Sequence, residues 1–308
     1  MFAKAMRSEL FRIGKMKCTY ILPVVLAGLI LLTNFIYTRI DLYGLMGYTA
    51  MDVETIQEMG TSAEGFEESF MTGFRAGLES SKRMEEDPSS LQILGEGPFY
   101  NQDVAVVFSL DTGSLYSLLL LAIFTGLYIG TVYSTGIDKN LNIFAGKRGL
   151  LMRCRLLLIA LYTLFIHLFT WLMAIVSMAL MGSSVRLMAD RSFVLYFIVT
   201  WLLTVSFTSI VASVTHLTRS KAAGITLGII LSAGILSTIM SVASLILQKL
   251  LSLGDGFNLG NYTVTQNIAS LTLFSDGHTV VRAIVCAILY FAFSYVLSSI
   301  AVKKRDIA

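Results

Sequence analysis

Charged residues are scarce in this sequence, and so are cysteine and histidine. Only 14% of the 308 residues are Asp, Glu, Lys or Arg, whereas about 25% is usual in soluble domains. Hydrophobic residues make up 55%, so the chain needs lipid as its solvent. Three cysteines without a C-x-x-C pair exclude a disulfide framework, and three histidines exclude a histidine-rich metal site.

Sequence motifs of nucleotide binding and hydrolysis are absent as well. No G-x-x-x-x-G-K-[ST] occurs, so the chain does not bind ATP through a P-loop of its own. Neither H-E-x-x-H nor a G-x-S-x-G elbow is present. We therefore expect no enzyme, no catalytic residue, and no metal or cofactor on this chain.

Long runs without charge are the main positive feature. A membrane span takes about 20 residues, and a seventh long run, 256–275, is too rich in Gly, Asn and Thr to be a full span. We expect the region 249–281 to hold a re-entrant or extracellular segment, because irregular backbone cannot face lipid unprotected. The other six runs predict an all-α polytopic membrane protein with spans at 18–38, 112–137, 156–185, 192–218, 222–248 and 283–302.

The basic residues predict the orientation of these spans. With the N-terminus inside, fifteen of the 23 Lys and Arg residues lie on the cytoplasmic side, together with only three acidic residues. Cytoplasmic loops carry an excess of Lys and Arg. Both termini are therefore expected to be cytoplasmic.

The first 17 residues predict an amphipathic helix. Phe2, Met6, Leu10 and Ile13 fall on one side of it, with charged residues elsewhere. Such a helix is expected to lie flat in the inner interface, with its cations near anionic headgroups. Residues 1–17 thus form an interfacial helix, and 18–308 form the six-span domain.

The segment 40–105, between the first two spans, is long and carries a net charge of −10. Phe66, Phe70, Phe74 and Leu78 recur every four residues, which predicts a helix with one apolar face. Two interpretations stay open. The helix caps the outer ends of the spans, or its acidic face gathers cationic substrates.

A basic cytoplasmic segment, 137–153, joins the second and third spans. Ile143 and Phe144 lie among polar residues between Gly136 and Gly146. This pattern predicts a short helix across the cytoplasmic ends of two spans. On its own, such a basic segment is typical of an anchor that sets orientation.

Polar groups inside the predicted spans are few. No Asp, Glu, Lys or Arg lies in the middle of a span, although proton-driven transporters commonly keep such groups there. His167 is the one titratable candidate deep in a span, as a packed side chain or a proton relay. Thr200, Thr204 and Thr208 either bond to backbone or line a polar path.

Small residues recur at steps of four in the fifth predicted span. Gly224, Gly228 and Ser232 would let another helix approach closely. That helix belongs either to the same subunit or to a second one. We take these three residues as the candidate subunit interface.

The whole arrangement resembles the ABC-2 type permease subunits of bacterial ABC transporters. Residues 1–17 match the family's interfacial connecting helix, 256–275 sits where the family has short re-entrant helices, and 303–307 resembles its basic-Arg-Asp-Ile ending. Tyr133–Arg155 resembles the coupling-helix segment. The resemblance implies ATPase-coupling roles for Gly136, Lys139, Asn140, Ile143, Phe144, Gly146, Lys147 and Arg148.

This resemblance implies a multi-pass subunit of an ATP-driven exporter in a bacterial plasma membrane. Such a permease pairs with itself or with a sister permease, and separate cytosolic ABC ATPase subunits hold ATP and Mg. Peptides or hydrophobic compounds are the expected cargo, and nucleic acid is not expected as a partner. The rival functions are a secondary transporter or channel that works without ATP, and an accessory sensor subunit built around the acidic segment.

Overall fold

The described part of the chain is all-helical and contains no β-strand. The computed structural model describes residues 2–39, 104–136, 148–182, 191–251, 258–273 and 275–304. Within these residues, five helices are long and apolar enough to cross a membrane. They are α2 (Cys18–Arg39), α8 (Tyr116–Thr135), α10 (Arg148–Leu180), α11 (Arg191–Thr218) and α15 (Gly277–Lys304). The all-α class is confirmed, and the apolar helices indicate a membrane-embedded protein.

The fifth predicted span is broken in two. In place of one helix over 222–248, α12 (Lys221–Ser232) and α13 (Ile235–Leu251) meet at an angle of 56°. Gly234 lies at the break with φ +73°, a left-handed conformation that glycine adopts without steric cost. If the bent pair counts as one span, the described residues contain six.

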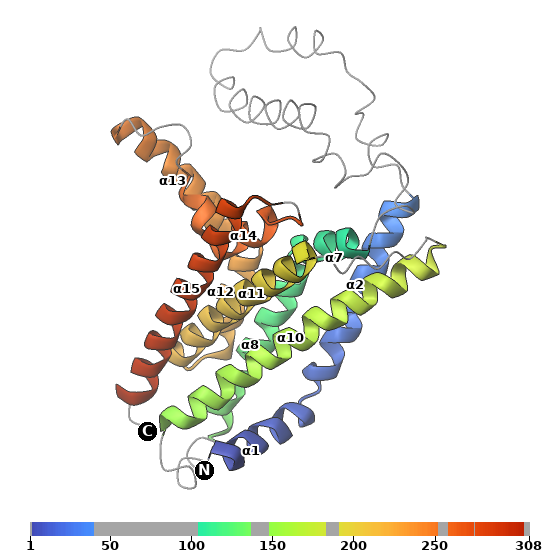
Figure 1. Cartoon of the computed structure of the whole chain (residues 1–308). Helices are drawn as coiled ribbons and strands as arrows, with labels where there is room; N and C mark the ends of the chain where they lie inside the picture. The colour runs from blue at the N-terminus through green and yellow to red at the C-terminus, as the bar shows by residue number, and fades with distance from the viewer. Residues whose placement is uncertain are drawn as a thin grey trace, which may run out of the picture.

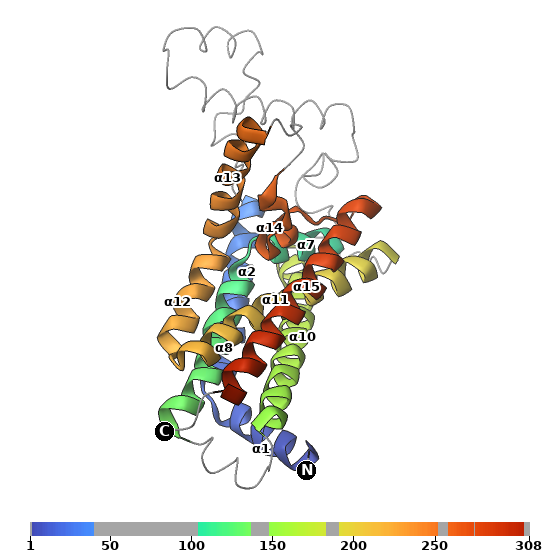
Figure 2. The same cartoon turned by 90° about the vertical axis from the view of Figure 1, so that its left-hand side faces the viewer.

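The two ends of the bundle carry different short helices (Figures 1 and 2). Helix α1 (Phe2–Lys15) lies where α15 ends, and we call this the α1 end. Helices α7 (Val104–Gly113) and α14 (Val264–Ser270) lie at the opposite end, the α7 end. The helix predicted from Phe66 to Leu78 lies outside the described residues.

Helix α11 lies at the centre of the bundle and packs on α8, α10, α12 and α15. Its Leu203 and Phe207 are buried in one apolar cluster, and Leu26, Phe124 and Tyr128 lie in a second one, between α2, α8 and α10. Large apolar side chains are exposed along the outer faces of α2, α10, α13 and α15. An outer surface of this kind suits contact with lipid tails, which are as apolar as leucine.

Several helix boundaries differ from the charge-free runs; α15, for example, begins at Gly277 and not at the predicted residue 283, with Arg282 inside the helix. Helix α10 begins at Arg148, well before the predicted residue 156, so that Arg153 and Arg155 lie inside the helix. Both charges have partners there: Arg155 is buried in an ion pair with Glu9, and Arg153 Nε donates to Tyr295 Oη at 3.0 Å. The predicted run 112–137 also begins inside α7. The chain turns at Leu115, which has φ 63°, before α8 starts.

The polar stretch 256–275 forms two short helical elements at the α7 end. A 3₁₀-helix, η2 (Leu259–Tyr262), is capped by the Asn258 side chain, and α14 is capped by that of Thr263. Ser244 of α13 accepts the Leu259 N–H at 2.6 Å. The Gly, Asn and Thr residues, which are unfavourable in a full span, thus form turns and helix caps here. Re-entry of this stretch into a membrane stays a prediction.

Candidate functional site

A carboxylate is fully buried at the α1 end. Glu9 of α1 is 0% exposed. Its Oε1 accepts a hydrogen bond from Arg155 Nε of α10 at 2.8 Å, and its Oε2 accepts one from the Tyr128 hydroxyl of α8 at 3.0 Å. Arg12 forms an ion pair with Oε2 at 2.8 Å and lies over the Tyr128 ring, 4.3 Å from its centroid. Burial of the charge is offset because both oxygens meet cations and donors. We call Glu9, Arg12, Tyr128 and Arg155 the Glu9 cluster.

Helix α1 turns part of its polar side toward the bundle. Ala5 and Glu9, one turn apart, are its buried residues, as expected for neighbours on one helix face. Phe2 and Leu10, from the predicted apolar stripe, are exposed. Glu9 therefore points into the protein, while the place of α1 in the membrane interface stays a prediction.

The Glu9 cluster joins the helices on both sides of the predicted coupling segment. Tyr128 lies on α8, which ends at Gly136 with φ +66°, and Arg155 lies on α10, which begins at Arg148. These two helices flank residues 137–147. The helices on both sides of that segment are therefore tied to each other and to α1.

Two of the eight predicted ATPase-coupling residues lie on described backbone. Gly136 is the C-cap of α8, and Arg148 is the first residue of α10. The other six lie outside the described residues: Lys139, Asn140, Ile143, Phe144, Gly146 and Lys147.

The small residues of the candidate subunit interface contact helices of their own chain. Gly224 faces Thr215 of α11, and Gly228 faces Ala122 of α8 and Val211 of α11. Ser232 is buried, and its hydroxyl donates to a carbonyl of α12. Packing within the chain accounts for the two glycines, while contact with a second subunit stays a prediction.

A matching pair of glycines on α8 was missed at the sequence level. Gly126 faces Ile225 of α12, and Gly130 faces Lys221 of the same helix. A side chain at either position would collide with the α12 backbone or the base of its side chains. Gly126-x-x-x-Gly130 is a small-xxx-small pattern, so the sequence carried the signal for a close α8–α12 contact.

Hydroxyl groups along α11 bond within their own helix. Thr200, Thr204 and Thr208 each donate to the carbonyl four residues earlier, at 2.8 to 3.0 Å. Ser209 does the same at 2.7 Å. Of the two alternatives left open by the sequence, the bonds to backbone are the ones that the structure shows.

His167 is packed among aromatic rings. It is buried, and its Nδ1 lies 3.2 Å from the Thr163 carbonyl, while Phe108 and Phe197 meet the imidazole edge-on. Its Nε2 has no hydrogen-bond partner among the described residues. A relay needs a second polar partner, so this geometry favours the packing role.

A second buried carboxyl group, Asp111, lies near the end of α7 and was not singled out by the sequence analysis. It is 1% exposed. Its Oδ1 accepts a hydrogen bond from the Tyr116 hydroxyl at 2.7 Å, and its Oδ2 lies 3.5 Å from Asn34 Nδ2. Asn34 of α2 also donates to Ser177 Oγ of α10 at 2.8 Å. We call these four residues the Asp111 cluster. In sequence, Asp111 marked only the edge of a charge-free run, which concealed its burial.

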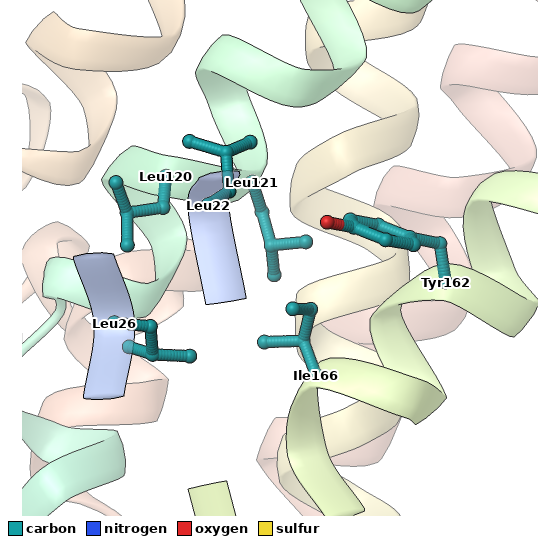
Figure 3. Close-up of a pocket in the computed structure, with 6 residues that line it drawn as sticks. All are labelled: Leu22, Leu26, Leu120, Leu121, Tyr162 and Ile166. Carbon is teal, nitrogen blue, oxygen red and sulfur yellow. The ribbon is translucent and has the colours of Figure 1, made fainter. Parts of the chain in front are cut away.

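A small apolar pocket lies between α2, α8 and α10 (Figure 3). Aliphatic side chains and the Tyr162 ring point toward one another there, and the space does not admit a water molecule. It is a seam between helices, and the one polar side-chain group of its lining, the Tyr162 hydroxyl, donates to the Thr19 carbonyl at 3.2 Å. Its lining consists of Leu22, Leu26, Leu120, Leu121, Tyr162 and Ile166.

The described residues contain no group of three or more His, Cys, Asp or Glu side chains that could hold a metal ion. Comparison with protein-family models and with curated proteins finds no match to this chain.

Proposed function

We propose that this chain is the membrane-spanning subunit of an ATP-driven exporter of the ABC-2 type. The subunit pairs with itself or with a sister permease, and separate cytosolic ATPase subunits bind ATP and Mg. The substrate class proposed is a peptide or a hydrophobic compound. The bacterial plasma membrane is the proposed location, with the α1 end in the cytoplasm.

The Glu9 cluster is the observation that carries this proposal. An exporter driven from the cytosol needs a contact segment whose movement reaches the spans. Residues 137–147 join α8 to α10, and the cluster ties both helices to α1 through Arg155 Nε and the Tyr128 hydroxyl. Packed elements linked in this way move as a unit when one of them is pushed. The basic residues of the same region support the cytoplasmic placement.

Within residues 137–148, Ile143 and Phe144 are proposed to dock into a cleft of the ATPase, with Lys139, Lys147 and Arg148 at a polar rim. Aromatic and arginine side chains are over-represented among residues that carry interface energy. Gly136 and Gly146 bracket the contact segment, and Asn140 lies between them. The candidate subunit interface, Gly224, Gly228 and Ser232, would require the pairing surface to include α12.

Co-purification tests the proposal. A tagged full-length chain taken from its own membrane should retain a cytosolic ATPase in stoichiometric amount. Phe144→Ala should lose that ATPase or its stimulation by substrate, because the aromatic anchor is removed. Phe11→Ala is a matched control, since Phe11 is an exposed aromatic residue of α1 outside the contact segment. Normal ATPase retention and stimulation in Phe144→Ala, at normal abundance, would return residues 137–148 to a purely anchoring role.

A secondary transporter is the second candidate function, and the buried Asp111 favours it. An ionisable group among helices of a membrane protein is often part of an ion pathway. The two functions differ in their energy source. Uptake or export by vesicles that contain only this chain and a proton gradient would support the transporter, whereas dependence on an added ATPase would support the exporter.

A further inference from the structure

The Asp111 cluster joins four helices at the α7 end. Asp111 belongs to α7, Tyr116 to α8, Asn34 to α2 and Ser177 to α10. Helices α2 and α7 also flank the acidic segment, which leaves from Arg39 and returns at Val104. The cluster therefore connects the helices on both sides of that segment to the bundle.

The charge of Asp111 is not balanced within the described residues. Both ion pairs among the described residues involve Glu9, which lies at the opposite end of the bundle from Asp111. A buried carboxylate is stable only when it meets a cation or several good donors. Asp111 has one short donor, Tyr116, and one at 3.5 Å, Asn34. A buried acid in these surroundings is more stable in its neutral form.

The other titratable groups near this turn do not supply the missing positive charge. Tyr196 of α11 donates to the Ser109 carbonyl at 3.4 Å. His167 of α10 packs against Phe108 of α7 and turns its Nδ1 to the Thr163 carbonyl. Helix α14 also packs on α7 but contains no titratable residue, and Asn34 of α2 is uncharged.

We propose that Asp111 is a proton-binding site and that its neutral carboxyl group fastens the α7–α8 turn to α2 and α10. The proton belongs on Oδ2, because Oδ1 already accepts the Tyr116 hydroxyl. With the Asn34 amide turned over, its oxygen accepts from Oδ2–H, and the loose 3.5 Å contact becomes a bond. The Ser177 hydroxyl then turns from the Ala174 carbonyl, which it meets at 2.9 Å, to the same Asn34 oxygen. Release of the proton leaves a buried charge and loosens the turn. This inference is independent of the proposed exporter function.

The titration falls in an accessible range. Helix α7 lies outside the candidate spans, and burial raises the pKa of Asp111 to about 7, while the hydrogen bonds from Tyr116 and Asn34 act in the lowering direction. A raised pKa in the folded state means that the folded protein binds the proton more tightly than the unfolded chain. The resulting stability is present at acidic pH and is lost as the pH rises through about 7.

The experiment compares the purified full-length chain in detergent micelles at about pH 5.5 and about pH 8.5, on either side of the Asp111 pKa. Infrared absorption should show the loss of one protonated carboxyl group at the higher pH. The thermal midpoint should fall by roughly 4 °C, from the part of the pKa shift lying in this window. Asp111→Asn should show neither change, because the amide has the shape of the neutral acid and does not titrate.

Asp276→Asn is the matched control. Asp276 is exposed next to the start of α15, and hydrogen bonding from Thr279 lowers its pKa, so it is ionised throughout the window. The control should keep both the infrared change and the shift in midpoint. Loss of the carboxyl signal in Asp276→Asn but not in Asp111→Asn would overturn the proposal.

Two further measurements separate proton binding from its alternatives. Tyr116→Phe removes the hydrogen-bond donor to Oδ1, which lowers the pKa of Asp111, so the carboxyl signal should be lost at a higher pH than in the wild type. An unshifted titration in Tyr116→Phe would refute the assignment. This test does not require Asp111→Asn to fold. Replacement of sodium by choline at about pH 8.5 should leave the midpoint unchanged. A midpoint that rises with sodium alone would identify a cation site and overturn the proton site.

Discussion

Replacement of Glu9 by Gln should loosen α1 from the bundle. Glutamine keeps the size of the side chain and an oxygen that can accept the Tyr128 hydroxyl, but it removes the charge that meets Arg155 Nε at 2.8 Å. Arg155 is 2% exposed, so its guanidinium stays buried without that carboxylate. Removal of one partner of a buried ion pair costs about 3 to 5 kcal/mol. The lower figure is appropriate because the Tyr128 bond survives.

A loss of about 3 kcal/mol corresponds to a rise of roughly a hundredfold in the fraction of molecules with α1 detached. Hydrogen exchange of the α1 amides, measured in detergent micelles or nanodiscs, reports that fraction directly when detachment is the opening step. Arg7→Gln is a matched control, because Arg7 is an exposed charge on the same helix. Its exchange rates should stay close to those of the wild type.

A double-mutant cycle with Arg155→Met decides whether the ion pair is responsible. If Glu9 and Arg155 stabilise each other, the double variant should be less destabilised than the sum of the two single variants, by more than about 1 kcal/mol. Additive effects would refute the reasoning, and so would unchanged exchange in Glu9→Gln. Either result would point instead to the apolar contacts of α1, those of Ala5 and Ile13.

Two further predictions concern packing and orientation. Gly228→Leu should lower the free energy of unfolding by about 1 to 3 kcal/mol, and with it the abundance and the thermal midpoint, because its Cβ would press on Ala122 and lie 3.2 Å from Val211 Cγ2. The crosslinked dimer per folded molecule should stay constant, and a selective loss of dimer would instead support the subunit interface. An impermeant thiol reagent should label Cys introduced at Glu67 but not at Lys147 in intact cells. Labelling at Lys147 from outside would reverse the orientation and remove the coupling assignment.

Charge-free runs predicted the helices well wherever the helix is buried or faces lipid over its whole length. The runs 18–38 and 192–218 lie within a residue of α2 and α11, because hydrophobic length sets the span when no charge has a partner. The same reasoning failed for α10, where Arg155 lies inside the helix. A charge with a buried partner does not end a helix, and its partner, Glu9, is 146 residues away.

The buried clusters depend on contacts between distant segments, which a single sequence does not reveal. Asn34 and Ser177 meet across 143 positions. The close approach of α8 and α12 was only half predicted. Gly228 of α12 was recognised as a point of close helix approach, whereas Gly126 and Gly130 of α8 required a comparison of two spans. Local patterns thus predicted elements, while the choice of neighbours came from the folded packing.

The bend between α12 and α13 bears on hydrophobic mismatch. A straight helix over both elements and the break would be roughly 45 Å long at the usual rise, far more than a hydrocarbon core of about 30 Å. Helix α12 has 12 residues and α13 has 17, or roughly 18 and 25 Å. With α12 along the membrane normal and α13 inclined by 56°, their combined height is roughly 32 Å. If the bent pair is one span, the left-handed Gly234 matches an overlong apolar run to the bilayer without tilting the whole bundle, and a substitution that straightened it would force the surrounding lipid to thicken.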